Sequence, residues 1–358
     1  MPVDPNRPVP DPDRAGGDPV GIGLHICRSP RVARTPMIEL LCYEPGIYAV
    51  DAGYLRPQLA AIYLLVEGGR VAVVDTATNA CLPRVLDALR SLGLPPTRVD
   101  YIFLTHVHLD HAGGAGAMMQ TFPEARLVVH PRGARHMADP APLFAAVQAV
   151  YGADAAERLY GELVPVPVER ILAAGDGHTL DLGGRTLVCL DTPGHARHHL
   201  SLLDTHSGGI FAGEAFGISL RELDVDGRAS ILPAIAPTQF DPAAMQASVE
   251  RLLSYQPPAL YLAHFGRIRD VSRLGGDLLR QIEAQVALAE RERDCGSERG
   301  ARLLAGLWER VNAEAARQGW RLAADSLHAV LDEYLALNAQ ALDGWVAQTA
   351  PRLCGDAA

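Results

Sequence analysis

The chain has 358 residues, of which 48% are hydrophobic and 21% are charged, a balance that is typical of a globular protein with a sizeable core. Its formal net charge of −10 argues against nucleic acid as the default partner, because binding to a phosphate backbone needs a basic surface. No stretch approaches the run of about 18 apolar residues that a membrane span needs, so no membrane partner is expected either.

The N-terminus and the cysteines indicate where the protein works. Residues 1–20 are rich in proline and aspartate and contain no apolar segment after a basic start, so we expect a disordered tail rather than a secretory signal. The six cysteines are scattered without a C-x-x-C pair, which favours reduced thiols over disulfides or a zinc knuckle. These features together predict a cytoplasmic protein.

The middle region, residues 21–270, predicts an α/β domain in which strands alternate with helices. Segment 62–76 reads as a strand, a turn at a glycine pair and a second strand, and segment 179–192 repeats that pattern. The apolar runs 101–105 and 259–262 predict two more strands. Polar residues that follow such strands are candidates for a functional site at the edge of a sheet.

The last region, residues 271–358, lacks strand signals and predicts three helices, at 272–293, 298–318 and 324–348. The third carries leucines and aromatic residues at helical spacing, so one of its faces must pack against another surface. We expect that surface to be the main domain or a second copy of the chain, which would form a homodimer through these helices.

Three of the thirteen histidines fall within six residues, at His106, His108 and His111, with Asp110 among them. Just after a strand, residues two apart project the same way, so His106 and His108 can bind one metal ion together. Asp110 and His111 lie where the chain turns into a helix, which displaces them toward a second position. Neutral imidazoles with a carboxylate suit zinc, and to a lesser degree iron or manganese.

Further ligands are expected from other strand ends. His195 follows the strand of the second glycine-pair segment, Glu214 follows a short apolar strand, and His264 follows strand 259–262. Each residue would be presented at the edge where open α/β sheets bind their ligands. His198, close after His195, is expected to be solvated.

With these residues the chain resembles the metallo-β-lactamase superfamily over about residues 45–270. The resemblance rests on the H-x-H-x-D-H motif of the cluster, on His195 in T-P-G-H, and on His264 after the last strand. It implies an αββα sandwich followed by an all-helical C-terminal extension. It also implies that Asp75, at the end of an early strand, supports the ligand histidines, and we expect Thr105 and His199 to contact the ligands in the same way.

The resemblance implies a site for two metal ions. One ion takes His106, His108 and His195, and the other takes Asp110, His111 and His264. The superfamily has an aspartate that bridges the two ions, whereas this chain has Glu214, which keeps the charge and adds a methylene. Two zinc ions per chain are therefore expected, with a single ion, or iron or manganese, as the alternative.

The implied reaction is hydrolysis of a small-molecule ester, thioester or lactone. Water bound to zinc ionises at a pKa of about 7 instead of about 15.7, so hydroxide is available to attack the substrate. Asp110 would orient this hydroxide and pass a proton to the leaving group. Alternatives on the same fold are a hydrolytic dehalogenase, a phosphodiesterase and an iron-dependent oxidoreductase, although iron-dependent relatives replace parts of the H-x-H-x-D-H motif, which is complete here.

Overall fold

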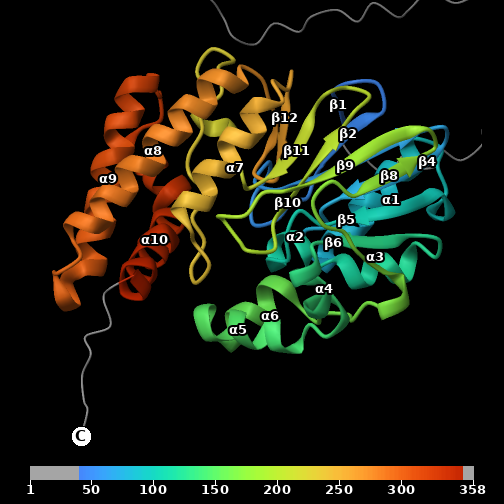
Figure 1. The fold of residues 1–358 in the computed structure, drawn as a ribbon, viewed down its shortest axis with the longest axis horizontal. Coiled ribbons are helices and arrows are strands. Elements are labelled where there is room, and N and C mark those ends of the chain that lie inside the picture. The colour runs from blue at the N-terminus through green and yellow to red at the C-terminus, as the bar shows by residue number, and fades with distance from the viewer. Residues whose placement is uncertain (1–39, 350–358) are drawn as a thin grey trace, which may run out of the picture. The chain divides into compact units, whose positions relative to one another are not determined.

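A computed structural model describes residues 40–349, so the tail expected at residues 1–20 lies outside the described residues. Two mixed β-sheets stack face to face, and helices cover the outer face of each sheet (Figure 1). This arrangement confirms the expected α/β class and the αββα sandwich. Among residues 40–349, no helix is long and apolar enough to cross a membrane.

The first sheet is antiparallel in its first half and parallel in its second, because hairpins join its early strands and helices join its later ones. The segment around the first glycine pair forms the β3–β4 hairpin, as expected. The seven strands lie in chain order: β1 (Leu40–Cys42), β2 (Ile47–Asp51), β3 (Ala61–Glu67), β4 (Arg70–Val74), β5 (Val99–Phe103), β6 (Arg126–Val129) and β7 (Ile171–Ala173).

The second sheet contains the other expected hairpin, β8–β9, and the strand expected at 259–262. Its pairs are antiparallel except β11–β12, which are parallel because α7 connects them. In spatial order its six strands are β13 (Gly266–Ile268), β12 (Leu260–Leu262), β11 (Ile210–Gly213), β10 (Leu200–Asp204), β9 (Arg185–Asp191) and β8 (Thr179–Leu182).

Helices connect the strands and form the outer layers. Three of them, α4 to α6, form an insertion between β6 and β7. The α-helices are α1 (Leu82–Ser91), α2 (Leu109–Ala112), α3 (Ala115–Thr121), α4 (Pro131–Ala138), α5 (Ala141–Tyr151), α6 (Ala153–Tyr160), α7 (Pro242–Ser254), α8 (Val271–Arg291), α9 (Arg299–Gln318) and α10 (Ala324–Thr349). Short 3-10 helices lie at Asn79–Cys81, Pro96–Arg98, Val168–Arg170, Arg221–Leu223 and Gly296–Glu298.

Three hydrophobic cores correspond to the three contacts between layers. The core between the sheets contains Tyr63, Phe211 and Tyr261, whose rings pack against one another and are almost fully buried. A second core lies under α1 and α3, and a third lies between the second sheet and α7 to α10. Removing this much apolar surface from water is the main force that holds the layers together.

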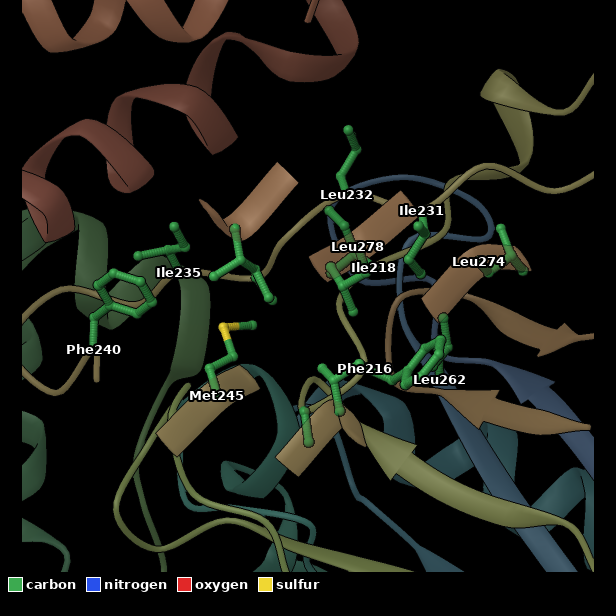
Figure 2. Close-up of a cluster of buried hydrophobic side chains, with 14 of the residues drawn as sticks. Phe216, Ile218, Ile231, Leu232, Ile235, Phe240, Met245, Leu262, Leu274 and Leu278 are labelled. Carbon is green, nitrogen blue, oxygen red and sulfur yellow. The ribbon is translucent and has the colours of Figure 1, made fainter. Parts of the chain in front are cut away.

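The three C-terminal helices occupy the expected places, as α8, α9 and α10, and they share one core with the second sheet. Figure 2 shows this junction, where Met245 of α7 and Leu278 of α8 lie near Phe216 and Leu262 of the sheet layer. The helices thus pack on the main domain, which was one of the two surfaces expected for them. The division of the chain at residue 270 into a catalytic domain and an extension stays a prediction.

One buried ion pair joins β9 to the end of β10. Arg185 Nε donates to Asp204 Oδ1 at 2.9 Å and Nη2 donates to Asp204 Oδ2 at 2.5 Å, and both side chains are fully buried. The arginine beside it, together with the Ser207 hydroxyl, outweighs the effect of burial and lowers the pKa of Asp204. A charge buried in this way is tolerated only while its partner is present.

We therefore expect Asp204→Asn to lower the free energy of unfolding by about 3 to 5 kcal/mol, because it removes both charged hydrogen bonds of the buried Arg185 and leaves only Glu67 Oε2, 3.8 Å away, as a counter-charge. Denaturant titration measures this loss. The matched control is Asp226→Asn, whose pair with Arg321 has both side chains 70% exposed and should lose less than about 1 kcal/mol. Equal losses in the two variants would contradict the role of burial.

Candidate metal centre

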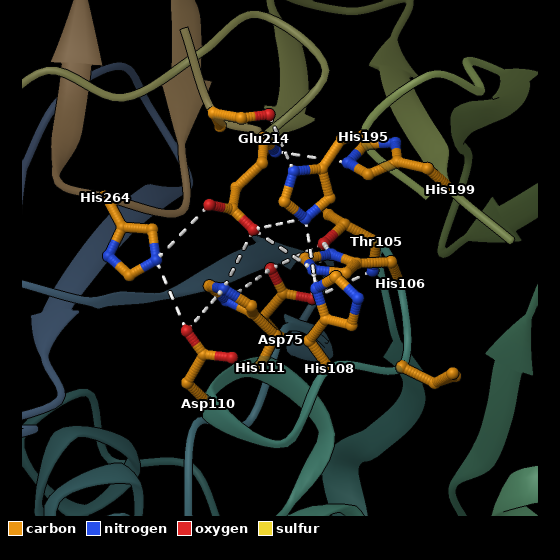
Figure 3. A network of polar contacts seen from close by, with 12 residues as sticks. Asp75, Thr105, His106, His108, Asp110, His111, His195, His199, Glu214 and His264 are labelled. Carbon is orange, nitrogen blue, oxygen red and sulfur yellow. Dashed lines mark hydrogen bonds and ion pairs between the residues drawn. The ribbon is translucent and has the colours of Figure 1, made fainter. Parts of the chain in front are cut away.

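The site lies where five strands end at one edge of the sandwich. Strands β4 and β5 are parallel, as are β11 and β12, and β9 runs parallel to β11 because both are antiparallel to β10. Asp75, His195, Glu214 and His264 lie just beyond β4, β9, β11 and β12, and the histidine cluster lies just beyond β5. The structure therefore brings residues from across about 190 positions of sequence to one place (Figure 3).

One group of ligand atoms comes from His106, His108, His195 and Glu214, all within 4.8 Å of one another. His108 Nδ1 lies 3.0 Å from both His106 Nε2 and His195 Nε2. Glu214 Oε2 lies 2.9 Å from His195 Nε2 and 3.2 Å from His106 Nε2. Three imidazoles and one carboxylate oxygen thus converge on one point.

A second group comes from Asp110, His111 and His264. Asp110 Oδ2 lies 3.2 Å from His111 Nε2 and 3.5 Å from His264 Nε2. Asp110 and His111 both lie in the helical turn α2, and this turn places them at a second position beside the first group.

Glu214 lies between the two groups. Its Oε2 is 3.4 Å from His111 Nε2 while its Oε1 is 3.6 Å from His264 Nε2, so one carboxylate contacts histidines of both groups (Figure 3). The longer side chain of glutamate therefore reaches the place between the groups that the resemblance assigns to an aspartate.

The hydrogen bonds behind the histidines determine which nitrogen atoms face the centre with a lone pair. A carbonyl can only accept, so His195 donates its Nδ1–H to Ala234 O and His264 donates its Nδ1–H to Leu59 O, each at 2.9 Å. Thr105 Oγ1 donates to Asp75 and so accepts from His106 Nδ1. In their neutral forms, all three rings then point an unprotonated Nε2 into the site.

These lone pairs lie close to other ring nitrogens and to carboxylate oxygens, an arrangement that protons or metal ions must stabilise. His111 Nε2 fits the same picture, because it is buried and makes no hydrogen bond within residues 40–349. Two ligands of a tetrahedral zinc ion lie about 3.3 Å apart at the usual bond lengths. The spacings of 2.9–3.6 Å between atoms of the site match that value, so the residues fit two divalent metal ions.

Burial and neighbouring charges shift the pKa values of the site residues. Burial and the adjacent imidazoles hold the pKa of His106 well below its usual range and lower that of His108 to about 4. Burial also acts on His111 and His195, but Asp110 and Glu214 outweigh it and raise their pKa values. Without metal, these carboxylates therefore favour the protonated forms of the two histidines, and a metal ion that binds there would displace such protons.

Asp75 and Thr105 orient His106 of the first group through hydrogen bonds behind its ring. Asp75 Oδ1 accepts the Thr105 backbone N–H at 2.8 Å, and its two oxygens lie 3.0 and 2.9 Å from the Thr105 hydroxyl. Burial raises the pKa of Asp75 to about 6, while His111 and the Thr105 hydrogen bonds favour the charged form. Asp75 itself has a φ of 58°, a left-handed conformation that a non-glycine residue adopts at some cost in energy.

His199 supports Glu214 instead of facing the centre. It is fully buried, its Nε2 accepts the Glu214 backbone N–H at 3.1 Å, and its Nδ1 lies 2.9 Å from Thr192 Oγ1. Gly213 makes this approach possible, because a Cβ at its φ of +53° would lie 2.6 Å from His199 Nε2. The turn after β11 thus positions the glutamate by a hydrogen bond to its own backbone.

The expectation that His198 is solvated is wrong. Its side chain is only 5% exposed, and its ring lies 5.7 Å from the His108 ring, edge to face. The loop that carries His195 turns this residue inward against the cluster. Adjacent residues of a loop, unlike those of a strand, need not alternate between buried and exposed.

The C-terminal helix α10 reaches the site through one loop. The Tyr334 hydroxyl and Asn338 Nδ2 donate to the backbone carbonyl of Pro233, next to the Ala234 carbonyl that accepts from His195. No pattern in the sequence predicts these contacts. The contacts of Pro233, Ala234 and Leu59 are made by backbone carbonyls, which leave no signal in sequence.

Both the sequence and the fold are similar to those of known proteins. A family model described as the metallo-beta-lactamase superfamily matches residues 55–264. The metallo-beta-lactamase fold-containing protein ST1585 from Sulfurisphaera tokodaii is 24% identical over 62% of this chain and 79% of its own length. Its crystal structure superposes with a TM-score of 0.54 over 67% of this chain and 86% of that chain.

Two relatives with named activities also match. A hydroxyacylglutathione hydrolase from Acidiphilium cryptum is 27% identical over 67% of this chain and 80% of its own length. A coenzyme F420H(2) oxidase from Methanothermobacter marburgensis is 30% identical over 43% of this chain and 34% of its own length. The first of these alignments covers most of both proteins, whereas the second covers about a third of the oxidase.

We expect Asp75→Asn to weaken metal binding by about 10- to 100-fold, because the amide group would place a donor against the two donors of Thr105 and disturb His106. Competition with a chromogenic chelator measures the affinity. Asp226→Asn is the control and should bind metal like the wild type. An unchanged affinity in Asp75→Asn would contradict the supporting role of this carboxylate.

Metal affinity should also fall as the solution becomes more acidic. Protons held by His111 and His195 compete with the metal, so each displaced proton weakens binding by roughly tenfold per pH unit below the pKa of its group. Chelator competition between about pH 6 and about pH 8 tests this expectation, since imidazoles titrate in that range. A pH-independent affinity would show that neither ring is protonated in the metal-free protein.

Proposed function

This chain belongs to the metallo-β-lactamase superfamily, and from that premise we propose that it is a zinc-dependent hydrolase of small-molecule esters, thioesters or lactones. The observation that carries the proposal is the pair of ligand groups joined by Glu214, with three Nε2 atoms directed inward by hydrogen bonds behind them. Members of this superfamily are generally metal-dependent hydrolases. The hydroxyacylglutathione hydrolase relative supports a thioester as substrate.

Two zinc ions would be held by the two ligand groups, with Glu214 contacting both. Divalent ions so held lower the pKa of bound water to about 7 and polarise the oxygen that gains charge in the reaction. The His and carboxylate ligands suit zinc, although the same donors also accept iron or manganese.

Asp110 is the residue that we propose handles the proton. Its side chain is 25% exposed, whereas that of Glu214 is only 11% exposed, so Asp110 is the acid better placed to reach a substrate. Burial alone would raise its pKa, but His111 and His264 together hold it well below its usual range and keep it ionised. An ionised Asp110 can accept a proton from the attacking water at the carboxylate oxygen that is not a metal ligand and transfer it to the leaving group.

Three other activities are alternatives on this fold. The oxidase relative supports an iron-dependent oxidoreductase, and a phosphodiesterase and a dehalogenase are the other two. The complete H-x-H-x-D-H motif favours hydrolysis over oxidation. The net charge of −10 favours a small-molecule substrate over nucleic acid.

The test is a panel of esters, thioesters, lactones, phosphodiesters and halogenated aromatics, assayed with zinc-loaded wild type and Asp110→Asn. We expect the variant to lose about 100-fold or more in kcat on the substrate that is turned over, because a neutral amide cannot accept the proton. Asp226→Asn should retain full activity.

Two results would overturn the proposal. The first is that no substrate is turned over in a manner that depends on Asp110. The second is stoichiometric iron with a visible absorption band in protein purified from ordinary medium, which would support the oxidoreductase instead.

A further inference from the structure

A cavity of about 950 Å³ lies next to the metal-ligand residues. It is formed by α4, by the loop that leads to and past His195, and by the start of α7. Gly194, the neighbour of His195, is part of its wall, and so is His198, whose ring contacts that of His108. Its volume is at the upper end of the 300–1,000 Å³ or so of small-molecule sites, so it can hold far more than a single inorganic ion.

The cavity is lined by three arginines, Arg132, Arg135 and Arg197, and by one acidic residue, Asp241. No ion pair in the described part of the chain involves any of the three arginines. The Asp241 carboxylate is already engaged, because it caps α7 by accepting the Ala244 backbone N–H at 3.0 Å. Three positive charges without a counter-charge are therefore gathered in one cavity of a protein whose net charge is −10.

The walls that carry the arginines are tied together. Arg132 Nη1 donates to the Arg197 carbonyl at 3.2 Å, and the Arg197 backbone N–H donates to Gln239 Oε1 at 3.0 Å. The Arg197 guanidinium itself has no hydrogen-bond partner within residues 40–349, so all its donors are available to a ligand. An unpaired guanidinium can bind phosphate or carboxylate oxygens in a bidentate manner.

We propose that this cavity binds the anionic, non-reacting end of the substrate, namely phosphate or carboxylate groups on the thiol part of a thioester. This inference rests on the proposed hydrolase function. The acyl carbon then lies at the metal-ligand residues, where water adds to it and the carbon–sulfur bond breaks, releasing a carboxylate, a free thiol and one proton. Contacts to the remote end contribute binding energy that positions the reacting carbon.

Three thioesters with the same acetyl group test the proposal: acetyl-coenzyme A with phosphates, S-acetylglutathione with carboxylates, and S-acetyl-N-acetylcysteamine with neither. Arg135→Ala/Arg197→Ala should lower kcat/KM for an anionic thioester by about 10- to 100-fold, because it removes hydrogen bonds between charged groups. The change for the neutral thioester should stay within about twofold. A larger fall in kcat/KM for acetyl-coenzyme A identifies phosphate as the recognised group, and a larger fall for S-acetylglutathione identifies carboxylate.

The control is Arg126→Ala, an exposed arginine at the start of β6, the end of that strand away from α4. It should behave like the wild type on all three thioesters. Arg135→Lys/Arg197→Lys keeps the charge without the fork of donors and should retain part of the preference for anions. It also provides a folded comparison if the alanine variant unfolds.

A binding measurement separates this inference from the hydrolase proposal. Calorimetry with adenosine 3′,5′-bisphosphate and S-methylglutathione, which contain no thioester, should show that at least one of them binds the wild type and binds the alanine variant about tenfold or more weakly. Binding that depends on the arginines without any thioester hydrolysis would refute the hydrolase proposal and leave the anion site standing. The anion site is refuted if neither probe binds, or if the alanine variant binds them as tightly as the wild type.

Discussion

The main physical constraint on this structure is that seven candidate ligand side chains repel one another unless protons or metal ions lie between them. Three imidazole Nε2 atoms and the oxygens of Asp110 and Glu214 converge at spacings of about 3 Å. Lone pairs and negative charges at such distances destabilise a fold unless protons or metal ions compensate them. Metal binding at these residues would therefore be coupled to folding, because the stable core positions groups that are themselves unstable together.

Several parts of the fold contribute to this arrangement from a distance. Asp75 acts through Thr105 on His106, and His199 acts through the backbone of Glu214. Helix α10 acts through the Pro233–Ala234 segment on His195, so the C-terminal helices are part of the support of the site and not only of the core. Each support uses a buried hydrogen bond, whose geometry is rigid because water cannot compete for it.

In the function that we propose, the candidate metal centre and the arginine-lined cavity have different tasks. The metal ligands are suited to activating water and stabilising developing charge, which is common to many substrates. The three arginines are suited to recognising one kind of substrate, because an anion held there places only certain bonds at the metal centre. In this proposal the catalytic groups lie at the strand ends, whereas the groups that select the substrate lie on α4 and on the loop that carries Arg197.

Sequence patterns by themselves indicated the α/β class, the three C-terminal helices and the chemical type of the site, because strand and helix periodicity and the H-x-H-x-D-H spacing are local patterns. The layered sandwich was expected only from the resemblance to the metallo-β-lactamase superfamily. The sequence did not show that Glu214 contacts both ligand groups, that His198 is buried, or that Ala234 and Leu59 orient two histidines. Those features depend on loops that meet from distant parts of the chain, and on backbone carbonyls that every residue possesses. Only the tertiary structure could decide them, since packing, not residue type, sets which carbonyl or carboxylate reaches which ring.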